Sequence, residues 1–135
     1  HVECSLERAG FYPRGGGLLQ VNIVPSRHLV PLHLTERGRL LRIRGLSAVG
    51  RLDRSIAERQ RSQAVERLRD LTVPLEIEVA EVPAGSPGTF IVLQAEFAGG
   101  RCCAFALGAL HKRAEKVADE AVDELRADIE AALAK

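Results

Sequence analysis

Alternating apolar and polar residues mark two short segments at the start of the chain. Residues 2–8 and residues 18–24 each place every second side chain on an apolar face, as half-buried strands do. The sequence Gly-Phe-Tyr-Pro-Arg-Gly-Gly-Gly lies between them at residues 10–17 and is called the glycine-rich turn below. These segments predict two antiparallel strands that the turn joins. Residues 29–34 alternate again, which is typical of a further strand.

A second set of elements is predicted from residue 40 onward. Strand patterns and helical spacings follow one another, with strands at 40–46, 73–82, 89–97 and 101–107 and helices at 53–70 and 114–134. The order is strand, helix, strand, then strand, strand, helix. A βαβ unit followed by a ββα hairpin predicts two helices on one four-stranded sheet, which is the thioredoxin-like arrangement of an α/β (α+β) protein. The redox motif of thioredoxins is absent, so we expect the fold without that chemistry.

The last helix carries the strongest periodic signal in the sequence. Its apolar stripe consists of Val117, Ala118, Ala121, Val122, Leu125, Ile129, Ala132 and Leu133. Acidic side chains dominate the opposite face, so this helix is expected to pack its stripe against the sheet. The earlier helix has its own start signal, because Asp53 or Ser55 can cap it.

Composition limits the class of protein. With 135 residues, of which 46% are hydrophobic, the chain can bury a real core and is expected to hold one domain, or one domain plus a piece of another. It has no apolar run near the ~18 residues of a membrane span and no signal-peptide pattern, so we expect a soluble cytoplasmic protein. It begins at His1 and contains no Met, and we therefore expect a segment of a longer protein.

Cysteine and histidine form no catalytic or metal-binding pattern. Cys4, Cys102 and Cys103 lack zinc-site spacing and are expected to be buried or half-buried strand residues in a reducing compartment. Adjacent Cys102 and Cys103 are expected on opposite faces of a strand. None of the four histidines lies in a Ser/His/Asp or metal-ligand arrangement, so we expect no metal site, and the histidine pattern by itself indicates no catalytic site.

Charge is unevenly distributed along the chain. Residues 37–69 contain ten arginines against three acidic residues, whereas acidic residues outnumber basic ones in residues 70–135. Such an excess of arginine can carry phosphate contacts, since each guanidinium presents a planar fork of donors. It can equally be a solvated face that pairs with the acidic last helix. The pattern leaves both interpretations open, and no stacking aromatics interleave with these arginines.

The glycine-rich turn also allows two interpretations. Three consecutive glycines can adopt positive φ and let the backbone approach a ligand closely, and Arg14 beside them suits a phosphate. Alternatively, the turn is a flexible hairpin loop in which Phe11 and Tyr12 cover the edge of the core. The pattern alone favours the second interpretation, because no helix follows the glycines.

Five motifs in order along the chain resemble the RNA 3′-terminal phosphate cyclase family. They are GFYPRGGG at 10–17, ERG at 36–38, RSIAERQ at 54–60, SPGTFIVLQAE at 86–96 and AEKVADEAVDEL at 114–125. The resemblance runs from about residue 8 to residue 134, and its first and last motifs are the most specific. The Ala-Leu-His-Lys-Arg segment at 109–113 departs from the Gly-Pro type of turn that the family usually has there.

The resemblance implies a division of the chain and a reaction for its parent protein. Residues 1–35 would be strands of the catalytic body, and residues 38–135 would be the thioredoxin-like insert domain. Family members use ATP and a divalent cation, Mg²⁺, to adenylate a histidine and pass AMP to an RNA 3′-phosphate. They then cyclise that end to a 2′,3′-cyclic phosphate. The catalytic histidine lies after the insert, so this chain alone is expected to be inactive and to bind neither cofactor tightly.

The resemblance also implies contact residues in the parent. The candidate phosphate and RNA contacts are Tyr12, Arg14, Gly15, Gly16, Gly17, Arg54 and Arg59, and the candidate adenine contact is Phe105. RNA 3′ ends are the expected partner. Two alternatives stay open: a non-catalytic binding protein for RNA or ribosome assembly within the same family, and a stand-alone thioredoxin-like adaptor. The exposed strands of residues 1–35 are also expected to permit self-association.

Overall fold

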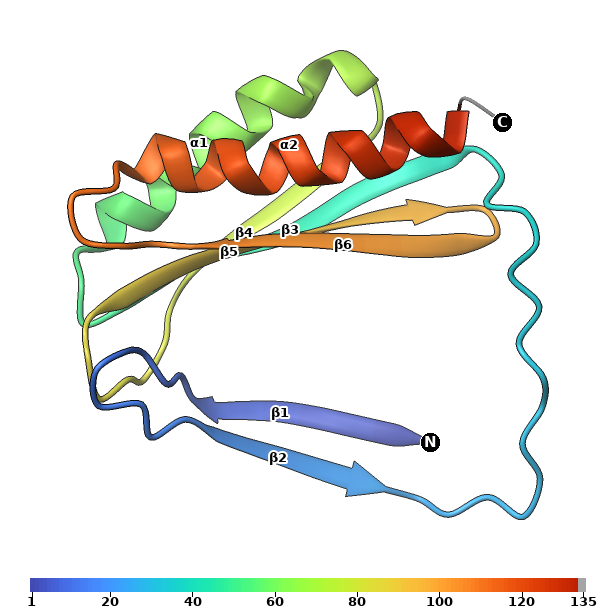
Figure 1. Cartoon of the computed structure of the whole chain (residues 1–135), viewed down its shortest axis with the longest axis horizontal. Coiled ribbons are helices and arrows are strands. Elements are labelled where there is room, and N and C mark those ends of the chain that lie inside the picture. Colours follow the sequence, from blue (N-terminus) through green and yellow to red (C-terminus); the bar gives the residue numbers. More distant parts are fainter. Residues whose placement is uncertain (134–135) are drawn as a thin grey trace.

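The computed structural model describes residues 1–133, and the side chains of residues 1–131. It contains two β-sheets and two α-helices (Figure 1). The elements in chain order are β1 (Val2–Arg8), β2 (Leu18–Ile23), β3 (Leu40–Gly50), α1 (Arg54–Leu68), β4 (Leu75–Glu81), β5 (Gly88–Phe97), β6 (Gly100–Leu107) and α2 (Ala114–Leu133). A 3₁₀ turn at Arg69–Leu71 follows α1.

The four-stranded sheet has the strand order β4-β3-β5-β6. β3 and β4 run parallel, whereas β5 is antiparallel to both β3 and β6. Both helices cover one face of this sheet, and the β1–β2 hairpin lies on the side of the other face (Figure 1). The predicted thioredoxin-like arrangement and the predicted α/β class are therefore confirmed. We call residues 40–133 the four-stranded unit.

The core lies between the four-stranded sheet and the two helices. Alternate residues of the central strands, among them Ile43, Ile91 and Leu93, are fully buried there. The apolar stripe of α2 meets them, as predicted, through Val117, Ala118, Ala121, Val122, Leu125 and Ile129. The side chains of the last two predicted stripe residues, Ala132 and Leu133, lie outside the described part. Aliphatic burial of this kind supplies most of the favourable free energy of folding.

A polar side chain is also buried in the core, and the sequence pattern missed it. Gln60 of α1 is fully buried; its Nε2 donates to Thr89 Oγ1 at 2.8 Å, and its Oε1 accepts from Ser47 Oγ at 2.9 Å. Thr89 Oγ1 donates in turn to the Ala48 carbonyl at 2.8 Å. Buried polar groups are tolerated where each has a partner, and these groups do. Gln60 therefore ties α1 to both central strands, β3 and β5.

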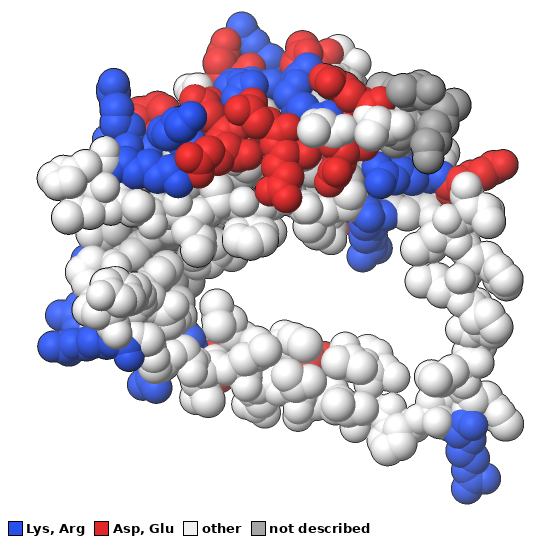
Figure 2. Space-filling model, in the orientation of Figure 1, with Lys and Arg blue, Asp and Glu red and all other residues white. Residues whose placement is uncertain are grey.

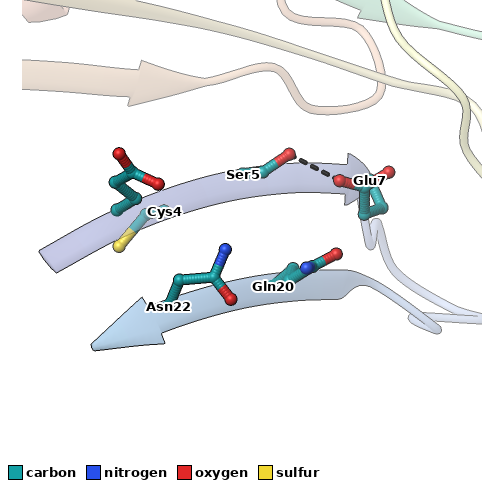
Figure 3. Close-up of a pocket in the computed structure, with 6 residues that line it drawn as sticks. Cys4, Ser5, Glu7, Gln20 and Asn22 are labelled. Carbon is teal, nitrogen blue, oxygen red and sulfur yellow. Dashed lines mark hydrogen bonds between the residues drawn. The ribbon is translucent and has the colours of Figure 1, made fainter. Parts of the chain in front are cut away.

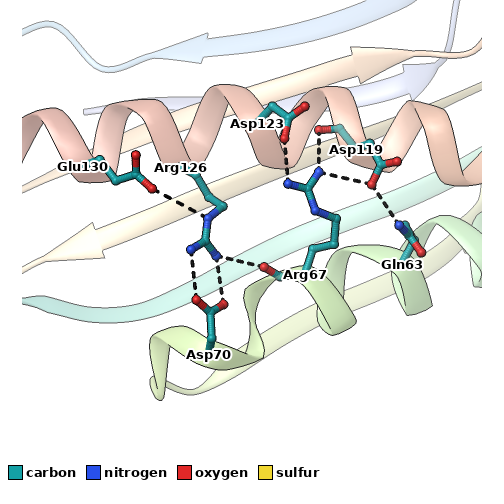
Figure 4. Close-up of polar contacts among 7 residues, drawn as sticks. All are labelled: Gln63, Arg67, Asp70, Asp119, Asp123, Arg126 and Glu130. Atoms are coloured by element: carbon teal, nitrogen blue, oxygen red, sulfur yellow. Dashed lines mark hydrogen bonds and ion pairs between the residues drawn. The ribbon is translucent and has the colours of Figure 1, made fainter.

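Charged side chains connect the outer faces of the two helices (Figure 4). Arg67 of α1 lies 2.7 Å from Asp123 and 3.2 Å from Asp119, both on α2. Arg126 of α2 reaches back and donates two hydrogen bonds of 2.9 Å to Asp70. The bonds from Arg126 lower the pKa of the Asp70 carboxyl. For the α1 side of the arginine-rich region, the interpretation as a face paired with the acidic last helix is thus confirmed.

The prediction of a further strand at residues 29–34 is wrong. These residues belong to a long connection from β2 to β3 that has no strand in the described chain (Figure 1). Leu29 is 92% exposed, and Val30 and Leu32 are similarly open to solvent. A strand needs a neighbour to accept its hydrogen bonds, and none of the described strands pairs with this segment; Pro31 also removes one donor.

The cysteine prediction holds only in part. Cys102 and Cys103 point to opposite faces of β6 as expected, and Cys102 is half-buried. Cys103 and Cys4 are exposed, because each lies on a sheet face that nothing in the described chain covers. Neither α1 nor α2, within the described residues, has the length and apolarity to cross a membrane.

Candidate phosphate-binding turn

The glycine-rich turn adopts the backbone conformation for which its glycines are suited. Gly15 and Gly16 have φ of +60° and +70°, a region that L side chains rarely enter. The Gly15 N–H donates to the Phe11 carbonyl at 2.8 Å, so this amide is already used. Apart from Gly15 and its two chain neighbours, no described residue has an atom within 4 Å of the position where a Gly15 side chain would begin. The turn therefore leaves open space beside Gly15 that a ligand can enter.

Phe11 anchors the turn to the four-stranded unit. A Cβ atom added at Gly88, the first residue of β5, would lie 2.2 Å from the Phe11 ring, and one added at Gly50 would lie 3.0 Å from it. The ring also lies 6.4 Å, centre to centre, from Phe90. Only glycine fits at positions 50 and 88 while Phe11 keeps this place. Sequence analysis did not assign these two glycines a role, because their contact is with a residue about 40 to 80 positions away.

Two hydrogen bonds also connect the turn to the four-stranded unit. We call this contact region, formed by Phe11, Gly50, Gly88 and the loop of residues 83–88, the joint. The Ala9 N–H donates to the Pro83 carbonyl at 2.8 Å, and the Arg14 N–H donates to Ser86 Oγ at 3.3 Å. Ser86 is buried, although it lies in a loop. The loop of residues 83–88 thus holds the turn just before its start and at its middle. Of the two interpretations of the turn, the hairpin one is right about Phe11, which packs on the unit, and wrong about Tyr12, which is 94% exposed.

The predicted phosphate and RNA contacts fall into two groups. Tyr12, Arg14, Gly15, Gly16 and Gly17 lie together in the turn, and the Arg14 side chain makes no ion pair with any described residue. The arginines of α1 lie across the sheet from the hairpin (Figure 1). The structure therefore brings the turn residues together but keeps the α1 arginines apart from them.

Both α1 arginines already have carboxylate partners. Arg54 Nε lies 3.2 Å from Glu58, and Arg59 donates to both carboxylate oxygens of Glu115 at 2.9 and 2.7 Å. This bidentate pair lowers the pKa of the Glu115 carboxyl. An RNA phosphate would have to compete with these carboxylates. Contact of either arginine with RNA stays a prediction.

Phe105 lies on the open face of the sheet, away from the helices. It is 61% exposed and stands in a row with Val92 of β5 and Leu46 of β3. Phe90, which meets Phe11 at the joint, is two residues from Val92 along β5 and points to the same face. Phe105 is thus a solvent-exposed aromatic ring on the same sheet face as Phe90 of the joint. Its contact with adenine stays a prediction.

A shallow hollow on the hairpin has a different character (Figure 3). It is lined by Glu3, Cys4, Ser5, Glu7, Gln20 and Asn22, and Ser5 donates a hydrogen bond to Glu7. Two carboxylates in this hollow disfavour an anionic ligand. No group of three potential metal ligands occurs within the described residues. The hollow is therefore a poor candidate for a phosphate or metal site.

The fold and the joint define a class of protein: a thioredoxin-like α/β unit with a glycine-rich turn packed against the loop that precedes β5. Residues 35–130 match the family model described as RNA 3′-terminal phosphate cyclase, insert domain. The relatives named RNA 3′-terminal phosphate cyclase include those of Staphylothermus marinus and Methanopyrus kandleri. The first is 40% identical over 98% of this chain, and the second is 41% identical over 91% of it. The chain belongs to the RNA 3′-terminal phosphate cyclase family.

The match covers only part of those relatives. The chain spans 40% of the length of the Staphylothermus protein and 37% of the Methanopyrus protein. A third relative of the same name, from Pyrococcus furiosus, is 35% identical over 94% of this chain, and 37% of its own length is covered. Membership of the family is therefore established for this segment, and the activity of a whole protein is a separate matter.

Proposed function

We propose that this chain is part of an RNA 3′-terminal phosphate cyclase, which converts an RNA 3′-phosphate to a 2′,3′-cyclic phosphate with consumption of ATP. The observation that carries the proposal is the identity of about 40% to proteins of that name over nearly the whole chain. In this proposal residues 1–35 belong to the catalytic body, residues 38–135 form the insert domain, and the enzyme works in the cytoplasm.

The residues of this chain bind and orient, and none of them is catalytic. The turn residues Tyr12, Arg14 and Gly15 to Gly17 face the RNA end, with Arg14 free to donate to its phosphates. Arg54 and Arg59 would contact RNA at a more distant point, in exchange for their present carboxylate partners. The catalytic histidine belongs to a segment outside this chain.

ATP and Mg²⁺ belong to the parent enzyme in this proposal. The exposed ring of Phe105 fits a purine, because an aromatic face with apolar neighbours stacks well on another ring. When bound, ATP supplies the adenylyl group that activates the RNA end. This chain by itself is expected to hold neither the nucleotide nor the metal tightly.

Replacement of the matching segment of the Staphylothermus cyclase by residues 1–135 tests the proposal. We expect this chimera to convert a 3′-phosphorylated oligoribonucleotide and ATP to the cyclic phosphate, measured by resistance of the RNA end to phosphatase. The isolated 135-residue chain is expected to show no turnover, and it is the matched control. A folded chimera without activity would favour the non-catalytic binding protein, and turnover by the isolated chain would contradict the assignment of the histidine.

We also propose that the isolated chain self-associates through its hairpin. Leu6, Leu19 and Val21 belong to β1 and β2 and are exposed. Exposed apolar strands readily pair with another copy. Leu19→Lys is expected to reduce association, and Gln20→Lys on the opposite face is expected to leave it unchanged. Sedimentation velocity at increasing concentration measures this, and a wild-type chain that stays monomeric throughout would contradict it.

A further inference from the structure

Arg8 and Arg51 each donate to a backbone carbonyl at the joint between the glycine-rich turn and the four-stranded unit, and Arg14 is held there through its backbone N–H. Arg8, at the end of β1, donates from Nε to the Gly16 carbonyl. Arg51, in the link from β3 to α1, donates from Nη1 to the Gly85 carbonyl at 3.4 Å. Gly85 in turn adjoins the carbonyl of residue 15, which lies 3.8 Å from where a Gly85 side chain would begin. Arg8 therefore contacts Gly16 directly, and Arg51 contacts Gly85, which lies beside Gly15.

These three arginines lack carboxylate partners in the described residues. Within residues 40–133, Arg61 also lacks such a partner, whereas the remaining arginines form ion pairs; these are Arg42, Arg44, Arg54, Arg59, Arg67, Arg69, Arg101, Arg113 and Arg126. Figure 2 shows the contrast: red and blue atoms intermingle over the helices, whereas blue atoms at the lower left, near the turn, have no red atoms beside them. A guanidinium without a neighbouring carboxylate keeps its full attraction for an anion.

The guanidinium groups at the joint keep most of their donors free. A guanidinium has five N–H donors, and Arg8 and Arg51 each use one of them on a backbone carbonyl. These carbonyl contacts fix the direction of each fork without neutralising its charge. Charge-assisted donors that are already oriented are the groups that bind phosphate most strongly.

The backbone of Arg51 adds a second observation. Its φ is +52°, in the left-handed region, where a residue with a Cβ costs roughly 1 kcal/mol relative to the right-handed region and glycine is the usual choice. Glycine at this position would remove the strain and also the guanidinium. Thr72 and His111 also have positive φ, so this conformation by itself assigns no role to Arg51, and the contact with Gly85 remains the observation that places Arg51 at the joint.

We propose that Arg51, from the four-stranded unit, is a second cation of the phosphate site at the glycine-rich turn. It acts with Arg14 on the backbone phosphates of a single-stranded RNA 3′ end. This composite site is then formed by the glycine-rich turn and the four-stranded unit together. The packing of Phe11 over Gly50 and Gly88 fixes the position of the turn, and with it Arg14, relative to the unit that carries Arg51. This inference rests on the proposed function, because it places RNA phosphates at the turn.

Binding of a fluorescent, 3′-phosphorylated oligoribonucleotide to the 135-residue chain tests the composite site. Fluorescence anisotropy at several KCl concentrations compares the wild type with Arg14→Gln, Arg51→Gln and Arg61→Gln. Arg61 is the matched control, because it is exposed, lies on α1 away from the turn and makes no ion pair with a described residue. Arg51→Gln removes the charge and shortens the side chain, and Arg51→Lys, which keeps the charge, separates these two effects.

Arg14→Gln and Arg51→Gln are each expected to weaken binding about fivefold to tenfold at low salt. Each should also reduce the slope of log K against log salt by about 0.7, the value for one phosphate contact with a single strand. Arg61→Gln should change neither quantity, and Arg51→Lys, which keeps the charge and lacks the fork, should keep the wild-type salt slope and weaken binding less than Arg51→Gln does. Equal urea midpoints for all variants confirm that folding is intact.

The outcomes separate this inference from the function on which it rests. If Arg14→Gln weakens binding and Arg51→Gln behaves as Arg61→Gln does, the composite site is wrong and the phosphate site at the turn stands. If neither variant differs from Arg61→Gln, RNA contacts another surface, and both the composite site and the turn assignment are wrong. Absence of RNA binding by the wild type at low salt overturns both as well.

Discussion

Replacement of Gln60 by Glu is expected to destabilise the folded chain by about 3 kcal/mol at pH 7. The Gln60 amide donates to Thr89 Oγ1, whose own hydrogen is directed to the Ala48 carbonyl. An ionised carboxyl at position 60 would direct an oxygen at a hydroxyl that has no hydrogen left to donate. Burial also disfavours the charged form, because little water reaches this site. The protonated carboxyl would have nearly the shape of the original amide and would still offer a donor.

The pH dependence of the stability of Gln60→Glu tests whether the ionised carboxyl causes the loss. The pKa of the new carboxyl would be raised in the folded state, well above its value in the unfolded chain. Its cost is therefore absent below the unfolded pKa and grows as pH rises towards the folded pKa. The expected result is a loss, relative to the wild type, that is small near about pH 4.5 and complete at about pH 7. Urea unfolding at both pH values measures it.

The wild type is the necessary reference at each pH. Its carboxyls at Asp70, Glu96 and Glu115 have lowered pKa values, chiefly through hydrogen bonds from Arg126, Arg42 and Arg59. The stability that they supply is present above the unfolded pKa and is lost as pH falls. Gln20→Glu makes the same change at an exposed position beside Glu3 and Glu7, where solvent screens the added charge, and should cost less than about 1 kcal/mol. If Gln60→Glu is as stable as the wild type at pH 7, the side chain at position 60 is not buried away from water with the hydrogen-bond partners described above.

Replacement of Leu125 by Ala is expected to cost about 3 kcal/mol, within the range of about 2 to 5 kcal/mol for buried leucines. Leu125 lies on the core side of α2 and is fully buried, so truncation leaves a cavity between the helix and the sheet. Neighbouring residues of the stripe are held by the helix and cannot fill it. The loss appears as a lower urea midpoint with an unchanged slope.

Leu110→Ala is the matched control for that measurement. Leu110 lies just before α2 and is 88% exposed, so the same truncation removes no buried contact. Its expected cost is below about 0.5 kcal/mol. Equal losses for Leu110→Ala and Leu125→Ala would contradict the packing of the α2 stripe against the sheet.

The candidate site was predictable in its residues and not in its geometry. The glycines and Arg14 stand side by side in the sequence, so a motif can indicate a phosphate-binding turn. Phe11 became an anchor only because Gly50 and Gly88, far away in the chain, leave room for its ring. Arg51 differs from the other arginines of its region through its contact with Gly85, which lies beside the turn. Which arginines are free for a ligand is decided by which carboxylates the fold brings near the rest.

The sequence by itself determined most of the strands, both helices and the apolar stripe of α2, because hydrophobic periodicity is a local property that each segment carries within itself. It also determined the family, through five motifs that occur along the chain in the order found in that family. Only the tertiary structure decided that Gln60 is buried, that residues 29–34 form no strand and that Arg59 pairs with Glu115. Each of these depends on whether a distant segment supplies a partner, and a pattern along one segment contains no information about that partner.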